Sequence, residues 1–181
     1  MPHPISDLTY KVVAYRAIEP VDSNESIDWA VEMMLVGYES QALDILAGIL
    51  KPTTYREVID YVEAAVRELG LQMKTGEDAL LSYASYYLRH MANGQEVKAH
   101  LKALYKFYTV SEPYFEPPFH DFYRLYWAWH DIDYFEQHPT GYATHDFYWA
   151  GSDKTNIESF VIGEAKKWME RYKERLALGS R

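Results

Sequence analysis

Apolar side chains recur at the spacing of a helix along most of the chain, and this periodicity restricts the fold more than any other feature of the sequence. In the stretch after Asp22, for example, Ile27, Ala30 and Met34 fall on one face of a helix. Cap residues precede such stretches, and a glycine or a proline usually follows them. Six to seven stretches of this kind predict an all-α protein, built as a bundle or as a short stack of helix pairs. The expected helices cover approximately residues 24–36, 40–50, 54–69, 75–92, 95–110, 118–135 and 156–178.

Two segments lack this periodicity. Leu8–Ile18 is rich in β-branched and aromatic residues, and we expect it to form one short strand or an extended arm. Residues 137–154 contain a proline and two glycines, which favours an irregular loop. Together the elements predict a single helical domain over residues 1–181, in which helix pairs over about 22–110 precede an aromatic-rich part over about 111–178.

The absence of cysteine and an acidic charge balance exclude several classes of function. Without cysteine there is no disulfide framework, no thiol nucleophile and no thiolate zinc site. A net charge of −9 disfavours binding to nucleic acid or to an anionic membrane. The sequence has no bilayer-length apolar run and begins without the pattern of a secretory signal, so we expect a cytoplasmic protein with no membrane partner. Phosphate-loop, dinucleotide and serine-hydrolase motifs are absent, and no cofactor is expected.

Aromatic residues are concentrated in one part of the chain. Residues 105–149 hold 17 of the 29 Phe, Trp and Tyr residues. The overlapping segment 112–153 carries eight acidic residues and a single basic residue, Arg124, for a net charge of −7. Tyrosine and tryptophan dominate the energetics of protein interfaces, and an acidic surface attracts a basic partner. This segment is therefore expected either to form a core helix with polar rims or to present a binding surface.

Three His-Asp dipeptides lie in the same part of the chain. Adjacent His and Asp residues ligate metal in the helical phosphohydrolases of the HD superfamily, which also use an upstream His and a downstream Asp. Structural roles are the competing interpretation, with the histidines capping helices or bonding to tyrosine hydroxyls and carboxylates. The metal-site interpretation would use His90, His120 and Asp121, with Asp146 or Asp153 as the downstream ligand.

Residues 25–70 resemble small helical bacterial proteins of unknown function, some of which are similar to the immunity proteins of bacterial toxin systems. The resemblance begins at Asp28–Gly37 (DWAVEMMLVG) and ends at Glu68–Gly70 (ELG). These residues are of the type that packs helices together, so the resemblance implies an all-α fold and assigns no functional residue.

The leading hypothesis is a non-enzymatic, acidic module that binds a basic protein, and in its most concrete form an immunity-type inhibitor that covers the active site of a basic toxin domain. The alternatives are an HD-like metal-dependent phosphohydrolase and a self-associating helical protein, a homodimer that uses Tyr126 and Trp127. The side chains expected to bind the partner are Tyr114, Glu116, Trp129, Asp131, Asp133, Tyr142, Asp146 and Trp149.

Overall fold

A computed structural model describes the chain except for residues 1–3, 19–21, 111–117, 140–144 and 179–181. Within the described residues the regular structure is entirely helical, which confirms the all-α prediction. These residues form nine helical segments, more than the six to seven expected, because α1 and α8 are helices of only four residues. The described chain divides into two compact units, one within residues 1–86 and 172–181 and the other within residues 87–171.

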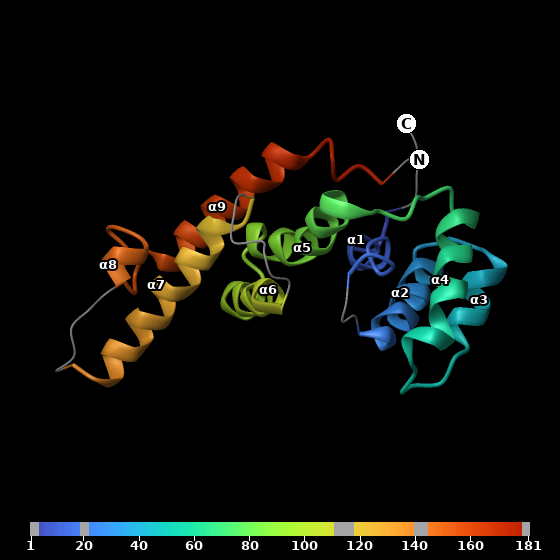
Figure 1. Cartoon of the computed structure of the whole chain (residues 1–181), viewed down its shortest axis with the longest axis horizontal. Helices are drawn as coiled ribbons and strands as arrows, with labels where there is room; N and C mark the ends of the chain where they lie inside the picture. Colours follow the sequence, from blue (N-terminus) through green and yellow to red (C-terminus); the bar gives the residue numbers. More distant parts are fainter. Residues whose placement is uncertain (1–3, 19–21, 111–117, 140–144, 179–181) are drawn as a thin grey trace. The chain divides into compact units, whose positions relative to one another are not determined.

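The first unit contains four complete helices and most of a fifth. Its helices are α1 (Thr9–Val12), α2 (Ser23–Leu35), α3 (Gln41–Ala47), α4 (Tyr55–Glu68) and the part of α5 (Gly76–Ala92) that ends at residue 86. Helix α3 packs against both α2 and α4, and the three helices lie side by side (Figure 1). The core of this unit includes the fully buried side chains of Trp29, Met33, Leu43, Leu46 and Val62.

Local cap residues set the beginnings of α2, α3 and α4, as the sequence predicts. The carboxylate of Asp22 accepts the N–H of Asn24 at 2.9 Å, and the hydroxyl of Ser40 accepts the N–H of Leu43 at 3.1 Å. At α4 the carboxylate of Glu57 accepts the N–H and the hydroxyl of Thr54, both at 2.8 Å. Hydrogen bonds from Thr54 lower the pKa of Glu57, because they stabilise the charged carboxylate.

The prediction of a strand or an extended arm over Leu8–Ile18 is wrong. The segment forms α1 and further turns, in which the N–H of Val12 donates to the carbonyl of Leu8 and the N–H of Val13 donates to the carbonyl of Thr9. Residues 8–15 are all buried, so the segment is covered on every side. Helical turns satisfy the buried backbone groups locally, and this requirement overrides the strand preference of the β-branched residues.

The second unit contains the end of α5 and four further helices. These are α6 (Val97–Val110), α7 (His120–Gln137), α8 (His145–Tyr148) and α9 (Ile157–Tyr172). The last residue of α9, Tyr172, belongs to the first unit. Helix α7 packs against α6 and α8 (Figure 1). The segment predicted to be an irregular loop therefore contains a short helix, α8. The core of this unit includes Leu88, Leu101, Leu104, Leu125 and Val161.

Helix α9 ends at Tyr172 rather than near Leu178 as predicted. The residues that follow dock onto the beginning of α5 within the first unit. The ammonium of Lys74 donates to the carbonyls of Arg175 and Ala177, at 3.1 and 2.9 Å, and Nε of Arg175 donates to Asp78 at 2.7 Å. These contacts bond two backbone carbonyls and one side chain of the segment after α9 to the residues around the beginning of α5.

No helix among the described residues has both the length and the apolar composition that a membrane crossing requires. The organisation of the chain as a single domain stays a prediction.

Candidate protein-binding surface on helix α7

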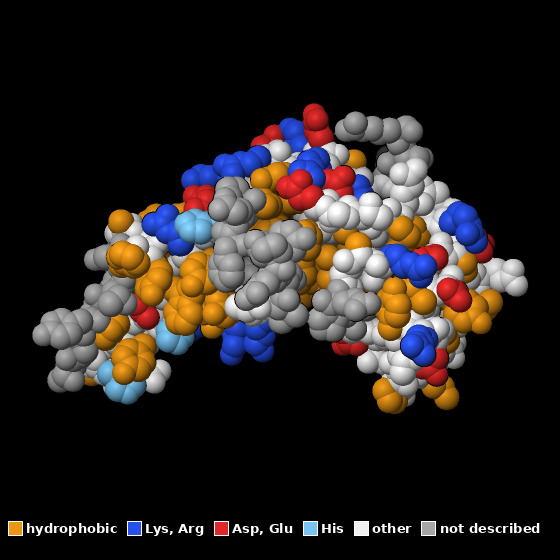
Figure 2. Space-filling model, viewed as in Figure 1, with side chains coloured by type: hydrophobic (Ala, Val, Ile, Leu, Met, Phe, Trp, Pro, Cys, Tyr) orange, Lys and Arg blue, Asp and Glu red, His pale blue; other side chains and the backbone are white. Residues whose placement is uncertain are grey.

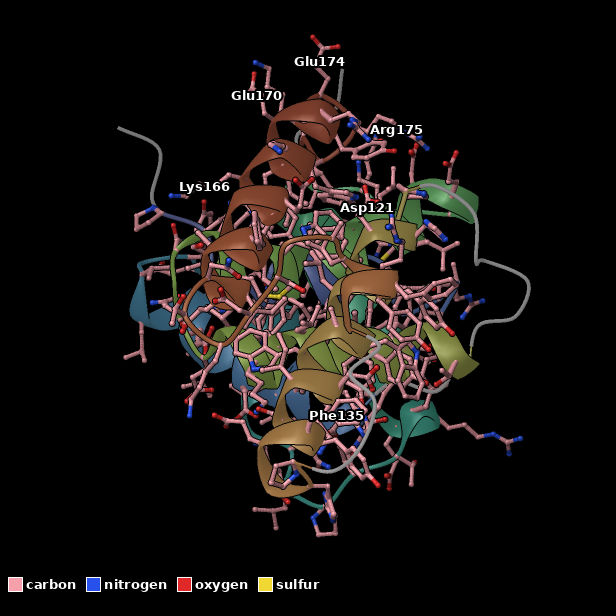
Figure 3. All side chains as sticks on the ribbon, turned by 90° about the vertical axis from the view of Figure 1, so that its left-hand side faces the viewer. Asp121, Phe135, Lys166, Glu170, Glu174 and Arg175 are labelled. Carbon is pink, nitrogen blue, oxygen red and sulfur yellow. The ribbon has the colours of Figure 1, made fainter. Side chains whose placement is uncertain are left out.

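Helix α7 buries one face and leaves aromatic side chains on the others. Phe122, Leu125, Ala128 and Ile132 are the buried residues of the helix. Their spacing of three or four residues defines a stripe that faces the core of the second unit. Asp121 lies at the beginning of the helix and Phe135 near its end (Figure 3). The partly buried aromatic residues outside the stripe are Tyr123, Tyr126, Trp127, Trp129 and Phe135.

Five of the aromatic side chains on α6, α7 and α8 form a cluster, which we call the aromatic cluster: Tyr105, Tyr123, Tyr126, Trp127 and Tyr148. Tyr105 stacks on Tyr126 with ring centroids 3.8 Å apart, and Trp127 meets the edge of Tyr105 at 5.7 Å. Trp127 also stacks on Tyr148 at 6.2 Å. Burial and the neighbouring Tyr123 and Tyr126 raise the pKa of Tyr105. The cluster therefore joins three helices through ring contacts.

Within this cluster, Tyr126 and Trp127 already contact Tyr105 of the same chain. A charge placed at either residue would therefore disturb the packing of α7 on α6. The hypothesis of a homodimer that uses these two residues as its interface stays a prediction.

The indole N–H of Trp127 is buried and has no hydrogen-bond acceptor among the described residues. Two other tryptophans of the chain do have acceptors. The indole of Trp29 donates to the hydroxyl of Thr9 at 2.9 Å, and that of Trp168 donates to the carbonyl of Pro118 at 3.0 Å. A buried donor without an acceptor costs about 1–3 kcal/mol, and among the described residues none accepts from this indole.

Two further aromatic side chains near the cluster are exposed. Phe147 of α8 keeps 83% of its surface accessible, and Tyr134 of α7 keeps 48%. Hydrophobic side chains gather over α7 and α8 in the space-filling view (Figure 2). Exposed aromatic residues that adjoin a partly buried cluster are typical of protein-binding surfaces.

Cationic side chains of the same chain cover the two described tryptophans that the sequence predicts to bind a partner. The ammonium of Lys98, on α6, lies 5.5 Å from the ring centre of Trp129 and 2.5 Å from Oδ2 of Asp133. The guanidinium of Arg124 lies 5.4 Å from the ring centre of Trp149. Both tryptophans therefore bind a cation through the face of the ring.

Lysines from outside the acidic segment neutralise part of its charge. Lys98 pairs with Asp133, and Lys154 pairs with Glu136 at 2.5 Å. The net charge of −7 counted along residues 112–153 includes neither lysine. Helical periodicity alone does not select Lys98 as the lysine of α6 that pairs with Asp133.

The remaining predicted partner-binding residues are only partly within the described structure. Asp131 is half-buried, and Nδ1 of His130 lies 3.5 Å from its carboxylate. Tyr114, Glu116, Tyr142 and the side chain of Asp146 lie outside the described residues.

The described candidate metal ligands do not form a cluster of three or more. The ring of His90 stacks on His100 at 4.7 Å, and its Nδ1 lies 2.8 Å from Oε1 of Gln95. The carboxylate of Asp153 accepts hydrogen bonds from residues 155 and 156 before α9. His120 and Asp121 are exposed at the beginning of α7. No group of three or more ligating side chains occurs in the described part of the chain, which leaves out the side chain of Asp146.

The first unit contains a buried ionic network that the sequence does not predict. Lys11 has 4% of its side chain exposed, and its ammonium lies 2.5 Å from both carboxylate oxygens of Glu25. It also lies about 5 Å from the ring centres of Tyr83 and Tyr86. The hydroxyl of Tyr15 donates to Glu25 at 3.0 Å, and burial together with that carboxylate raises the pKa of Tyr15. The only sequence signal is one lysine inside the apolar segment LTYKVVAY.

Comparison with known proteins finds no relatives. No family model matches the chain, and neither the curated proteins nor the solved structures include a match. The resemblance of residues 25–70 to toxin-system immunity proteins therefore stays a prediction.

Proposed function

We propose that this protein is a non-enzymatic binding module that uses α7, α8 and the aromatic cluster to bind a basic protein. The observation that carries the proposal is the exposed ring of Phe147, which meets Tyr148 of the aromatic cluster at 5.5 Å within a segment of net charge −7. An exposed aromatic side chain in acidic surroundings suits a basic partner.

The exposed aromatic residues supply the contact area for such a partner. Phe147 and Tyr134 offer large apolar surfaces beside the cluster. Burial of an aromatic side chain at an interface contributes about 25 cal/mol per Å² of apolar area removed from water. The two residues would therefore act as anchors for the partner.

Charge indicates the chemistry of the partner. The whole chain carries a net charge of −9, which accelerates association with a cationic protein and disfavours an anionic one. The rings of Trp129 and Trp149 each receive a cation in the free protein, from Lys98 and Arg124. Lysine and arginine side chains of a partner have the same chemistry. In the most specific form of this proposal the partner is a bacterial toxin domain, as the resemblance of residues 25–70 implies.

The proposal is tested with labelled peptides of equal length in which arginine, lysine or glutamate alternates with serine. We expect the two basic peptides to bind and the acidic peptide not to bind, with an affinity that falls as salt is added. Single alanine substitutions at Trp129, Asp133 and Trp149 should each weaken binding by about fivefold or more, a loss of about 1 kcal/mol or more.

The matched control is Tyr61→Ala, which removes an exposed aromatic side chain from α4 in the first unit. It should leave the affinity unchanged. Equal binding of acidic and basic peptides would contradict the proposed partner chemistry. Unchanged affinity in the variants at Trp129, Asp133 and Trp149 would contradict the proposed surface.

A further inference from the structure

Lys98 makes two contacts that a cationic side chain of a partner could make in its place. It extends from α6 and places its ammonium against the carboxylate of Asp133 and over the ring of Trp129. Trp129 and Asp133 are four residues apart on α7, so their side chains lie on the same face of the helix. One ammonium therefore receives an ion pair and a cation–π contact together.

We propose that Trp129 and Asp133 form the receiving site for a lysine or arginine side chain of the partner, and that Lys98 occupies this site in the free protein. This inference rests on the proposed function, because it names the residues that select the basic partner. Lys98 thereby becomes a competitor of the partner within the same chain.

The exposure of the pair makes such an exchange feasible. The side chain of Lys98 is 58% exposed and that of Asp133 is 36% exposed. Ion pairs and cation–π contacts in such surroundings are weak, since water and salt screen them. A partner can therefore displace Lys98 at little cost, and in doing so it gains the contacts that Lys98 gives up.

Lys102 provides a matched comparison for Lys98. It lies four residues further along α6 and its side chain is exposed, so its removal changes the net charge of the protein by the same amount. Long-range electrostatics alone predicts the same gain in affinity from Lys98→Ala and Lys102→Ala. Occupation of the receiving site by Lys98 predicts a larger gain from Lys98→Ala.

The test measures the affinity of the arginine–serine peptide for the full chain. We expect Lys98→Ala to tighten binding by about three- to tenfold, the worth of two exposed contacts, and Lys102→Ala to change it by less than about twofold. In protein that carries Asp133→Asn, the gain from Lys98→Ala should shrink to that of Lys102→Ala.

Two results would overturn the inference, and they are distinguishable. If Lys98→Ala and Lys102→Ala act equally while the unaltered protein binds the peptide, the receiving site is wrong and the proposed function stands. If neither the unaltered protein nor either variant binds the basic peptides, the inference and the basic partner of the proposed function both fail.

Discussion

The buried pair of Lys11 and Glu25 yields a quantitative prediction about the stability of the first unit. The ammonium of Lys11 is almost completely buried, with 4% of the side chain exposed, so it cannot regain water when its counter-charge is removed. Breaking a buried ion pair by removal of one partner costs about 3–5 kcal/mol. We therefore expect Glu25→Gln to lower the free energy of unfolding by about that amount.

The opposite substitution should cost less, because the two partners differ in exposure. Glu25 has 26% of its side chain exposed and accepts the hydroxyl of Tyr15 at 3.0 Å. When Lys11→Met removes the ammonium, water and this hydroxyl still stabilise the carboxylate. We expect a cost of about 1–3 kcal/mol, the penalty for a partly satisfied polar group.

The double variant separates the ion pair from other effects. With both charges removed, no charge remains buried without its partner, so the combined cost should fall short of the sum of the single costs by about 1 kcal/mol or more. Urea denaturation at neutral pH, followed by circular dichroism, gives the three values. The exposed pair of Lys51 and Asp28 is the control, and Lys51→Met should cost about 0–1 kcal/mol. Additive costs, or a smaller loss in Glu25→Gln than in Lys11→Met, would contradict a stabilising contact between the two buried charges.

Three further substitutions have defined outcomes. The raised pKa of Tyr15 keeps its hydroxyl protonated in the folded protein, so the free energy of unfolding falls as the pH rises above the unfolded pKa of about 10. Tyr15→Phe should reduce this alkaline loss by about 1.4 kcal/mol per pH unit above 10, measured by denaturation at pH 8 and 11. Arg175→Ala removes the bonds to Asp78, so chymotrypsin should cut after Tyr172 and Leu176 faster while the melting temperature changes little; an unchanged rate of chymotryptic cleavage would contradict the docked arrangement. Trp127→Phe removes an indole N–H without a described acceptor, whereas Trp168→Phe removes one that is hydrogen-bonded, so Trp127→Phe should destabilise the free protein less. A larger loss of unfolding free energy for Trp127→Phe in urea denaturation would be inconsistent with this difference.

Local signals in the sequence were sufficient to predict most of the helices. The carboxylate of Asp22, the hydroxyl of Ser40 and the Thr54–Glu57 pair each bond to backbone groups within three residues. Such contacts depend only on neighbouring positions in the chain, so the sequence predicts where they occur. For the same reason the predicted beginnings of α2, α3 and α4 agree with the structure.

Features that depend on tertiary contacts could not be read from the sequence. The segment around Lys11 has strand-like composition, but it is buried and folds as helical turns, and Lys11 contacts Glu25 and two tyrosines from other helices. The segment that follows α9 bonds to Lys74, which lies about one hundred residues away in the sequence.

The candidate surface was predictable in composition but not in detail. The aromatic and acidic residues of α7 are evident in the sequence. The position of Lys98 over Trp129 depends on how α6 packs against α7, and the lack of an acceptor for Trp127 depends on every neighbour in the unit. Neither fact has a signature in local spacing.

The most direct test of the proposed binding surface is a titration of the protein, labelled with ¹⁵N at its tryptophans, with the arginine–serine peptide. The chain has five tryptophans, so the spectrum contains five indole signals, and two of them serve as internal controls. The account predicts that the signals of Trp127, Trp129 and Trp149 shift on binding, while those of Trp29 and Trp168, whose donors are already bonded, stay in place. Shifts confined to the two controls, or an unmoved Trp127 signal at saturating peptide, would contradict it.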